Sequence, residues 1–285
     1  MMSDPIAGAR AGRFVQGPGA GADKAGTAWS GIGRMALATI LVGLGVRGLW
    51  TGEFAGTWQS IPIDNLPWRL AWAYATALVE LAVGLALLSR RTARWASWAL
   101  LIFTGMWAVL LKLPAVVATP ALEATWLGLG EITVIVAAAW LLFHARAQAR
   151  DGAPDHTPAW KPGIVAARTL YALSLPAIGL SHFFYLPQTI GFVPSWMPYP
   201  AFWACLTGAS DIVACLGVLF GILPRLAASL EAAMLMAITL LVWLPGAVAA
   251  PGDASLTPLL MSAAIAAGAW VVADSYRALP WRGIR

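Results

Sequence analysis

Long apolar stretches dominate the chain, and each is long enough to form a helix that crosses a bilayer. A hydrocarbon core of about 30 Å requires about 20 apolar residues in a helix. Eight stretches of roughly this length occur, at approximately residues 33–50, 68–88, 94–113, 126–144, 164–185, 200–222, 226–245 and 258–274. Because every backbone polar group must be paired inside lipid, this pattern predicts membrane-spanning helices.

The composition also indicates that lipid, not water, surrounds most of the chain. The 285 residues are 60% hydrophobic and only 11% charged, with a mean hydropathy of +0.74. Soluble domains usually carry about 25% charged residues, so this chain has too little polar surface to cover a soluble globule. We expect an all-α integral membrane protein with about eight transmembrane helices, in contact with membrane lipid.

Lysine and arginine are distributed unequally between the loops on the two sides of the predicted membrane. When alternate loops are assigned to opposite sides, fifteen of the 18 Lys and Arg residues fall on the side that holds both termini. Only Arg69 and Lys112 fall on the other side, and Arg47 lies within the first span. The positive-inside rule therefore predicts that both termini are cytoplasmic. These basic clusters are topology signals, and we expect no nucleic-acid partner.

Part of the sequence recurs at a fixed spacing. The segment LPAVVATP at 113–120 returns as LPGAVAAP at 244–251, an offset of 244 − 113 = 131 residues. At the same offset, Glu80 in the second span corresponds to Asp211 in the sixth. This agreement predicts two copies of one unit.

The predicted duplication divides the chain into five parts. They are a disordered cytoplasmic tail at 1–32, a first unit at 33–146, a cytoplasmic linker at 147–163, a second unit at 164–277 and a tail at 278–285. Each unit has an even number of spans and must enter and leave on the same side. We therefore expect two four-helix bundles that are parallel repeats, related by a pseudo-twofold axis along the membrane normal.

The second unit resembles the DoxX/DoxD family of small four-helix membrane proteins. The resemblance rests on the order of five short motifs, which are Gly179-Leu-Ser-His182, Val193-Pro-Ser-Trp-Met-Pro198, Thr207-Gly-Ala-Ser-Asp211, Gly217-Val-Leu-Phe-Gly221 and Arg225-Leu-Ala-Ala. The first unit shares fewer of these features, and Gly48 or Arg47 stands where the histidine would fall. If the chain has a reactive site, we expect one, in the second unit.

The resemblance implies a membrane component of a redox system. Family members look like partners in thiosulfate:quinone oxidoreductases and quinol oxidase complexes. It implies a subunit of a respiratory or sulfur-redox system in the bacterial inner membrane, with quinone as the cofactor and a redox protein as the partner. Whether the chain itself is an enzyme stays open.

Ionisable residues within the spans are the candidate catalytic groups, because each is costly to bury in lipid. They are His182, Asp211 and Glu80. An imidazole at the depth of a quinone head group could exchange a proton near neutral pH. Glu80 and Asp211 have a structural alternative as interhelical hydrogen-bond partners. A further acid, Glu231, could pair with Arg225.

Four residues near the outer side are candidates for binding a cofactor, namely Ser181, Trp196, Glu131 and Arg47. Arg47 and Glu131 share one depth in the first unit, so a buried ion pair between them is the alternative. Two of the three histidines, His144 and His156, lie at or beyond the cytoplasmic boundary. We therefore expect no metal site and no pair of haem ligands.

Two other functions fit the sequence. A small-solute or proton-coupled transporter would agree with tandem repeats and mid-membrane acids, although few obvious helix breaks occur at matching mid-span positions. A scaffold or assembly partner without turnover would use the buried polar groups only for packing.

Overall fold

The described part of the chain is built from helices that are long and apolar enough to cross a membrane. The computed structural model describes residues 22–56, 58–59, 66–148, 162–277 and 279–281. These ranges contain no strand and eight candidate spans, which confirms the all-α membrane fold. The helices are α1 (Ala22–Thr51), α2 (Arg69–Leu88), α3 (Ala93–Trp107), η1 (Ala108–Lys112), α4 (Leu113–Ala118), α5 (Glu123–Gln148), α6 (Pro162–Phe184), α7 (Leu186–Phe192), α8 (Pro200–Leu219), α9 (Pro224–Ile238), η2 (Thr239–Trp243), α10 (Leu244–Ala249) and α11 (Asp253–Ser275).

The helix ends lie close to the expected ends of the apolar stretches, except at the start of α1. This helix begins at Ala22, inside the segment 1–32 that was expected to be a tail. Residues 1–21 lie outside the described part of the chain, as do 149–161 of the expected linker and 278 and 282–285 of the expected C-terminal tail.

The third and seventh spans each contain one π-helical segment, η1 or η2. In η1 the Leu113 N–H donates to the carbonyl of Ala108, and in η2 the Leu244 N–H donates to that of Thr239. Proline follows at once in both spans, and its missing N–H and bulky ring disturb the normal helical bonding. Both spans nevertheless stay helical through the π-helical segment, so this matched pair is an irregularity within a continuous helix and not a break.

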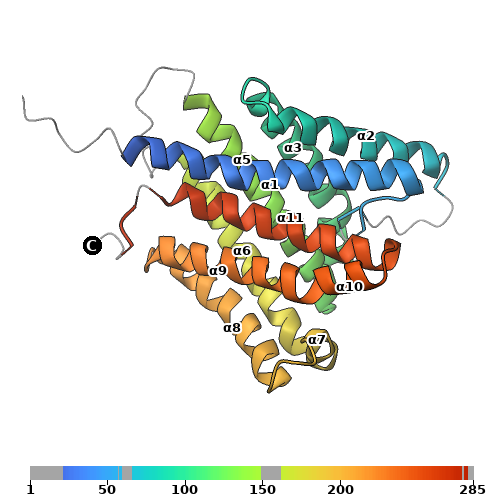
Figure 1. Cartoon of the computed structure of the whole chain (residues 1–285), viewed down its shortest axis with the longest axis vertical. Coiled ribbons are helices and arrows are strands. Elements are labelled where there is room, and N and C mark those ends of the chain that lie inside the picture. Colours follow the sequence, from blue (N-terminus) through green and yellow to red (C-terminus); the bar gives the residue numbers. More distant parts are fainter. Residues whose placement is uncertain (1–21, 57, 60–65, 149–161, 278, 282–285) are drawn as a thin grey trace, which may run out of the picture.

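The eight spans form one continuous body. Helix α1 packs on α2 and α11, and α5 packs on α3, α6 and α11. Helix α6 also packs on α8, and α9 packs on α8 and α11. Figure 1 shows α2 and α3 on one side of α1 and α11, with α8 and α9 on the opposite side. Helices α5 and α11, the last spans of the two halves, also contact each other. The halves are therefore joined through these two helices.

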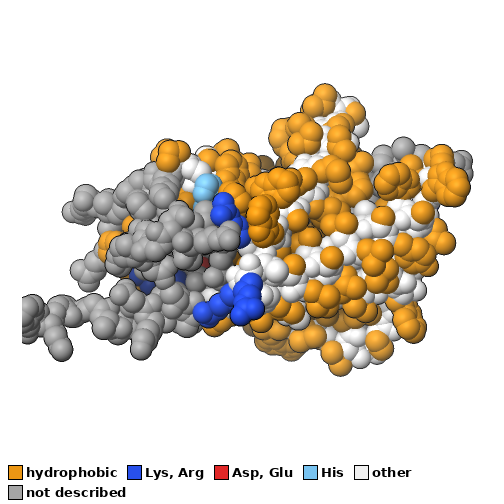
Figure 2. Space-filling view, turned by 90° about the horizontal axis from the view of Figure 1, so that it is seen from above, with side chains coloured by type: hydrophobic (Ala, Val, Ile, Leu, Met, Phe, Trp, Pro, Cys, Tyr) orange, Lys and Arg blue, Asp and Glu red, His pale blue; other side chains and the backbone are white. Residues whose placement is uncertain are grey.

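The surface fits a lipid environment. Large hydrophobic side chains are exposed on every long span, including Leu78 at 53%, Val109 at 59% and Val213 at 65%. On the face shown in Figure 2, hydrophobic side chains spread over the part that is described, and the visible Lys and Arg side chains lie together toward one end of that part. We call the end that holds Arg94, Arg225 and Arg277 the arginine end. The chain is a multi-pass membrane protein.

Helix bounds in the two halves correspond at the offset of 131 residues. Adding 131 to the bounds of α2, α3, η1 and α4 gives those of α8, α9, η2 and α10. Even an unusual backbone conformation recurs, because Trp68 before α2 has a φ of 60° and Tyr199 before α8 has a φ of 56°. Equivalent helical positions in the two halves can therefore be compared residue by residue.

An ion pair at the non-arginine end connects the loop after α1 to α2. The Arg69 guanidinium donates to the Glu53 carboxylate at 2.5 and 3.3 Å, and both side chains are nearly half exposed. This hydrogen bond lowers the pKa of Glu53 below its usual value. A lowered pKa in the folded state stabilises the fold above the unfolded pKa, and the effect is lost as the pH falls.

We therefore predict a small acid-sensitive contribution from this pair. Its size is limited by solvent, because exposed pairs contribute little. Thermal midpoints of the purified protein in detergent should fall slightly as the pH drops through the range where Glu53 becomes protonated. Glu53→Gln should remove this slope and lower the midpoint slightly at pH 7. An unchanged slope in Glu53→Gln would assign the acid sensitivity to other carboxyl groups.

Candidate functional site

The closest approach of α6 and α8 is made through two glycines. A Cβ atom placed on Gly179 would lie 2.6 Å from the carbonyl oxygen of Gly208, and a Cβ on Gly208 would lie 2.6 Å from that of Gly179. Only glycine leaves room for such a backbone contact. Each glycine lies three residues before a polar side chain, which is His182 on α6 and Asp211 on α8. The crossing therefore brings these two side chains together.

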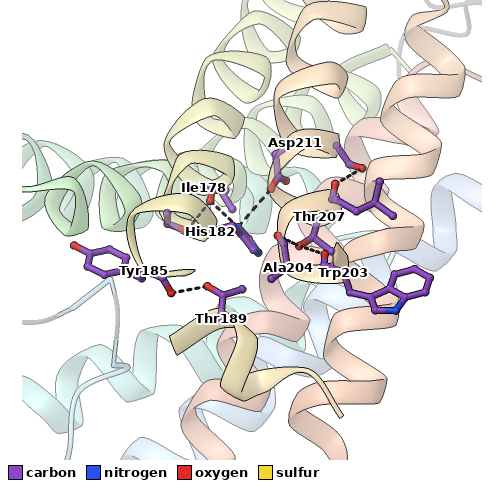
Figure 3. Close-up of polar contacts among 11 residues, drawn as sticks. Ile178, His182, Tyr185, Thr189, Trp203, Ala204, Thr207 and Asp211 are labelled. Carbon is purple, nitrogen blue, oxygen red and sulfur yellow. Dashed lines mark hydrogen bonds and ion pairs between the residues drawn. The ribbon is translucent and has the colours of Figure 1, made fainter. Parts of the chain in front are cut away.

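His182 faces Asp211 at the non-arginine end of α6, as Figure 3 shows. The imidazole Nδ1 lies 4.0 Å from Asp211 Oδ2 and 3.1 Å from the carbonyl oxygen of Ile178. A carbonyl can only accept a hydrogen bond, so this contact requires the proton on Nδ1. Nε2 then carries the lone pair, and it can accept a hydrogen bond from a ligand.

Behind Asp211 lies a cluster of buried polar groups with unmet hydrogen-bonding capacity. Asp211, Glu231 on α9 and Tyr171 on α6 are each no more than 2% exposed. The two carboxyl groups interact with each other, and both act electrostatically on the Tyr171 hydroxyl. Among the described groups, neither carboxyl nor the hydroxyl has a hydrogen bond of good geometry. Such groups are rare in folded proteins and call for an explanation.

The equivalent acid in the first half has a hydrogen-bond partner. Glu80 on α2 accepts a hydrogen bond of 2.8 Å from Gln59, and Gln59 in turn accepts one of 3.0 Å from the backbone of Ala55. Gln59 and the neighbouring Trp58 are both 1% exposed, so the loop after α1 folds inward over Glu80. This arrangement favours the structural alternative for Glu80.

The polar cluster behind Asp211 has no counterpart in the first half. At the offset of 131, Glu231 corresponds to Leu100 and Tyr171 corresponds to Ile40. Leu100 is itself 1% exposed, so an apolar side chain fills that position in the core. Among the described residues, the cluster of two neighbouring acids and a tyrosine therefore belongs to the second half.

Two expected ion pairs are not formed. The electrostatic partner of Glu131 is Lys112 on η1, because η1 packs on α5 whereas Arg47 belongs to α1, which packs on α2 and α11. The expected pair of Arg47 with Glu131 is therefore wrong. Arg47 instead lines an open pocket of about 490 Å³ between the ends of α1 and α11, with Trp50 and Leu256 among its neighbours.

The pairing of Glu231 with Arg225 is also wrong. Arg225 donates a hydrogen bond of 2.8 Å to the carbonyl of Leu279 and lies 3.9 Å above the ring of Trp281. Glu231 is turned toward Asp211 instead. Arg225 thus holds the segment after α11 at the arginine end.

The remaining candidates lie near the site without joining its polar contacts. The Ser181 hydroxyl donates to the carbonyl of Ile178 in its own helix at 2.6 Å. Trp196, between α7 and α8, is 69% exposed. His182 and Asp211 are the predicted residues that the structure brings together, whereas Glu80, Glu131 and Arg47 occupy other helices or surfaces.

Sequence reasoning missed the role of Glu231 and did not single out Tyr171. The sequence does contain a signal for Glu231, because the equivalent position in the first copy is Leu100. A buried charge is costly, so such an unequal pair points to a function that one copy lacks. Depth in the membrane and the nearest arginine in the sequence do not indicate that Glu231 faces Asp211.

Comparison with known proteins finds a family match to part of the chain. Residues 163–244 match the DoxX family, a segment that includes Tyr171, His182, Asp211 and Glu231. No curated protein and no solved structure matches the chain significantly. The matched segment thus lies in the half of the molecule that holds the polar cluster.

Proposed function

We propose that this chain, a membrane protein that carries a DoxX domain at residues 163–244, binds a quinol head group at His182 as a subunit of a membrane redox system. The observation that carries the proposal is the state of the His182 ring. Its Nδ1 is held by Ile178 and faces Asp211, and its Nε2 is left to accept a hydrogen bond.

The residues present fit a quinol. A quinol hydroxyl is a hydrogen-bond donor, which suits the Nε2 lone pair. When His182 takes up the proton at Nε2, the imidazolium keeps its Nδ1–H on the Ile178 carbonyl and lies beside the Asp211 carboxyl. Bound quinol would supply the electrons, which pass to a partner redox protein. His182 acts as the proton acceptor and Asp211 as the residue that stabilises and orients it.

The surroundings of His182 suit a ligand that arrives from the lipid. Phe184 and Trp203 belong to the same end of α6 and α8 and are 66% and 36% exposed. Exposed aromatic rings near the membrane interface offer flat apolar surfaces to a ring-shaped head group. The short helix α7 follows α6 at this end and covers part of the site.

The proposal includes the duplication and the topology. The matched bounds of α2 with α8 and α3 with α9 support two copies of one unit, at 33–146 and 164–277. The arginine end fits the cytoplasmic side by the positive-inside rule, and His182 would then lie near the outer side of a bacterial inner membrane. Of the two equivalent acids, Glu80 and Asp211, Glu80 lacks neighbours like Glu231 and Tyr171. Glu80 would therefore serve only to hold helices together.

Quinol binding provides the test. We expect the purified full-length chain to quench its tryptophan fluorescence on titration with decylubiquinol. His182→Ala should weaken the apparent affinity by about tenfold, which is the loss of one hydrogen bond of roughly 1.4 kcal/mol. The matched control is His144→Ala. This variant removes a histidine of α5 at the arginine end, away from His182, and should bind quinol as the natural protein does.

Three results would contradict the proposal. They are the absence of saturable quinol binding, equal binding by His182→Ala and the natural protein, and equal weakening by both alanine variants. Purification from native membranes gives a second measurement, since a redox subunit should copurify with quinone and with a redox protein. A scaffold would copurify with a protein partner but without quinone.

A further inference from the structure

We propose that Asp211, Glu231 and Tyr171 form a proton-conducting chain that connects His182 with the arginine end of the membrane. Quinol binding concerns only the His182 end, so this inference goes beyond the proposed function. It assigns an activity to the buried groups behind Asp211, which the binding of a head group does not require.

The contacts follow one another from helix to helix. His182 on α6 lies 4.0 Å from the Asp211 carboxyl on α8. Asp211 and Glu231 are both buried on the packed helices α8 and α9 and are electrostatic neighbours. Tyr171 on α6 lies within electrostatic range of both acids and of Tyr276, which follows α11. Each neighbour in this series can accept or donate a proton.

The series covers much of the membrane. Positions 171 and 182 on α6 are separated by about 16 Å at 1.5 Å per residue. Tyr276 follows the last turn of α11 at the arginine end, and the Arg168 guanidinium lies 3.8 Å above its ring. Burial raises the pKa of Tyr276 to about 12, so it stays a neutral hydroxyl at pH 7. The chain of groups thus starts at His182 and reaches the opposite end of the bundle.

Burial explains why the two acids favour proton transfer over fixed charge. Two carboxylates side by side in apolar surroundings repel each other strongly, so the pair holds a proton between them. The hydroxyl of Tyr171 is also buried without a hydrogen-bond partner among the described groups. A proton can then move when one of these side chains rotates or a water molecule enters. No hydrogen bond that holds these side chains in place has to break first.

The first half shows that the fold does not need these groups. There, leucine and isoleucine stand at the positions of Glu231 and Tyr171, and Glu80 is held by Gln59. The same helical frame is therefore built with an apolar interior at these positions. Burying two acids and a tyrosine in the second half has a cost in folding free energy. Proton conduction explains why these residues are present despite that cost.

Proton flux into liposomes tests the proposal. Liposomes that hold the full-length chain, potassium and the pH dye pyranine are diluted into sodium buffer, and valinomycin then creates an inside-negative potential. We expect the interior to acidify faster than in protein-free liposomes. Glu231→Leu, which copies the first half, should lower the protein-dependent rate by at least about tenfold. Tyr171→Phe removes one hydroxyl and should also lower it.

Glu231→Gln keeps the size of the side chain and decides the matter if the leucine variant does not fold. Its amide carries no proton that it can pass on, so we expect the same loss of flux. The matched control is Glu80→Gln, which changes the equivalent acid of the first half and should leave the flux unchanged. A natural protein no faster than empty liposomes, or a Glu231→Gln variant with normal flux, would overturn the proposal.

Quinol binding and proton flux can fail independently. Glu231→Gln should bind decylubiquinol normally, because Glu231 lies behind Asp211 and away from Nε2 of His182. Flux without quinol binding would reject the proposed function and keep the proton chain. Quinol binding without flux would reject the proton chain and keep the proposed function.

Discussion

Gly208→Val should leave little correctly folded protein. A Cβ at this position lies 2.6 Å from the carbonyl oxygen of Gly179 and 2.8 Å from the Cβ of His182, so α6 and α8 must separate to admit it. Overpacking in a core costs about 1–3 kcal/mol, and contact with backbone leaves little room for relief. We expect a marked fall in the thermal midpoint and in the monodisperse fraction in detergent, together with loss of the contact between His182 and Asp211.

Gly105→Val is the control for this variant. Gly105 lies on α3, and a Cβ at this position meets no other atom within 4 Å. Valine there should fold as the natural protein does, because nothing has to move. If the two valine variants lost stability equally, close packing of α6 on α8 would not be the reason that glycine is needed at 208.

Trp58→Ala should cause the largest loss of stability in the first half. The ring is 1% exposed although it belongs to a loop, and it lies beside the buried Glu80. Removing a buried aromatic ring costs about 3–5 kcal/mol through lost contacts and the cavity that remains. The substitution also opens a path for water to Glu80. We expect a strongly lowered thermal midpoint in detergent.

Trp50→Ala separates the effect of burial from the loss of a tryptophan. Trp50 ends the same helix that leads into the loop, but its side chain is 89% exposed. Its removal should change the free energy of unfolding by no more than about 0.5 kcal/mol, so the thermal midpoint should hardly move. If Trp58→Ala behaved like Trp50→Ala, the loop would not be packed over Glu80 as the structure shows.

Most of the fold could be predicted from the sequence because the thickness of a bilayer sets the length of an apolar stretch directly. All eight spans were expected near their observed bounds. The π-helical segments were missed, because proline in a span does not by itself say whether the helix bends, breaks or widens. The extension of α1 back to Ala22 was missed as well, since Gly and Ala before the span resemble a tail.

The candidate site could be predicted only for His182 and Asp211, because each residue ends one of the motifs on which the family resemblance rests. Histidine and aspartate each stand three residues after a glycine, at 182 and 211, and the glycine contact brings them together. The place of Glu231 depends on how α9 is rotated toward α8, and the partner of Glu131 depends on which helix packs against α5. Depth in the membrane determines neither of these, so the pairs based on depth were wrong.

The contact between α5 and α11 has a consequence for how such a protein could have arisen. Each of these helices is the fourth span of one proposed unit, and each packs on the first span of the other, α5 on α6 and α11 on α1. A gene that encoded a single unit would yield a subunit with its last helix bare on one side, and two copies would cover each other about a twofold axis. Fusion of such a homodimer into one polypeptide would allow one copy to lose the second acid and the tyrosine while the other copy kept them.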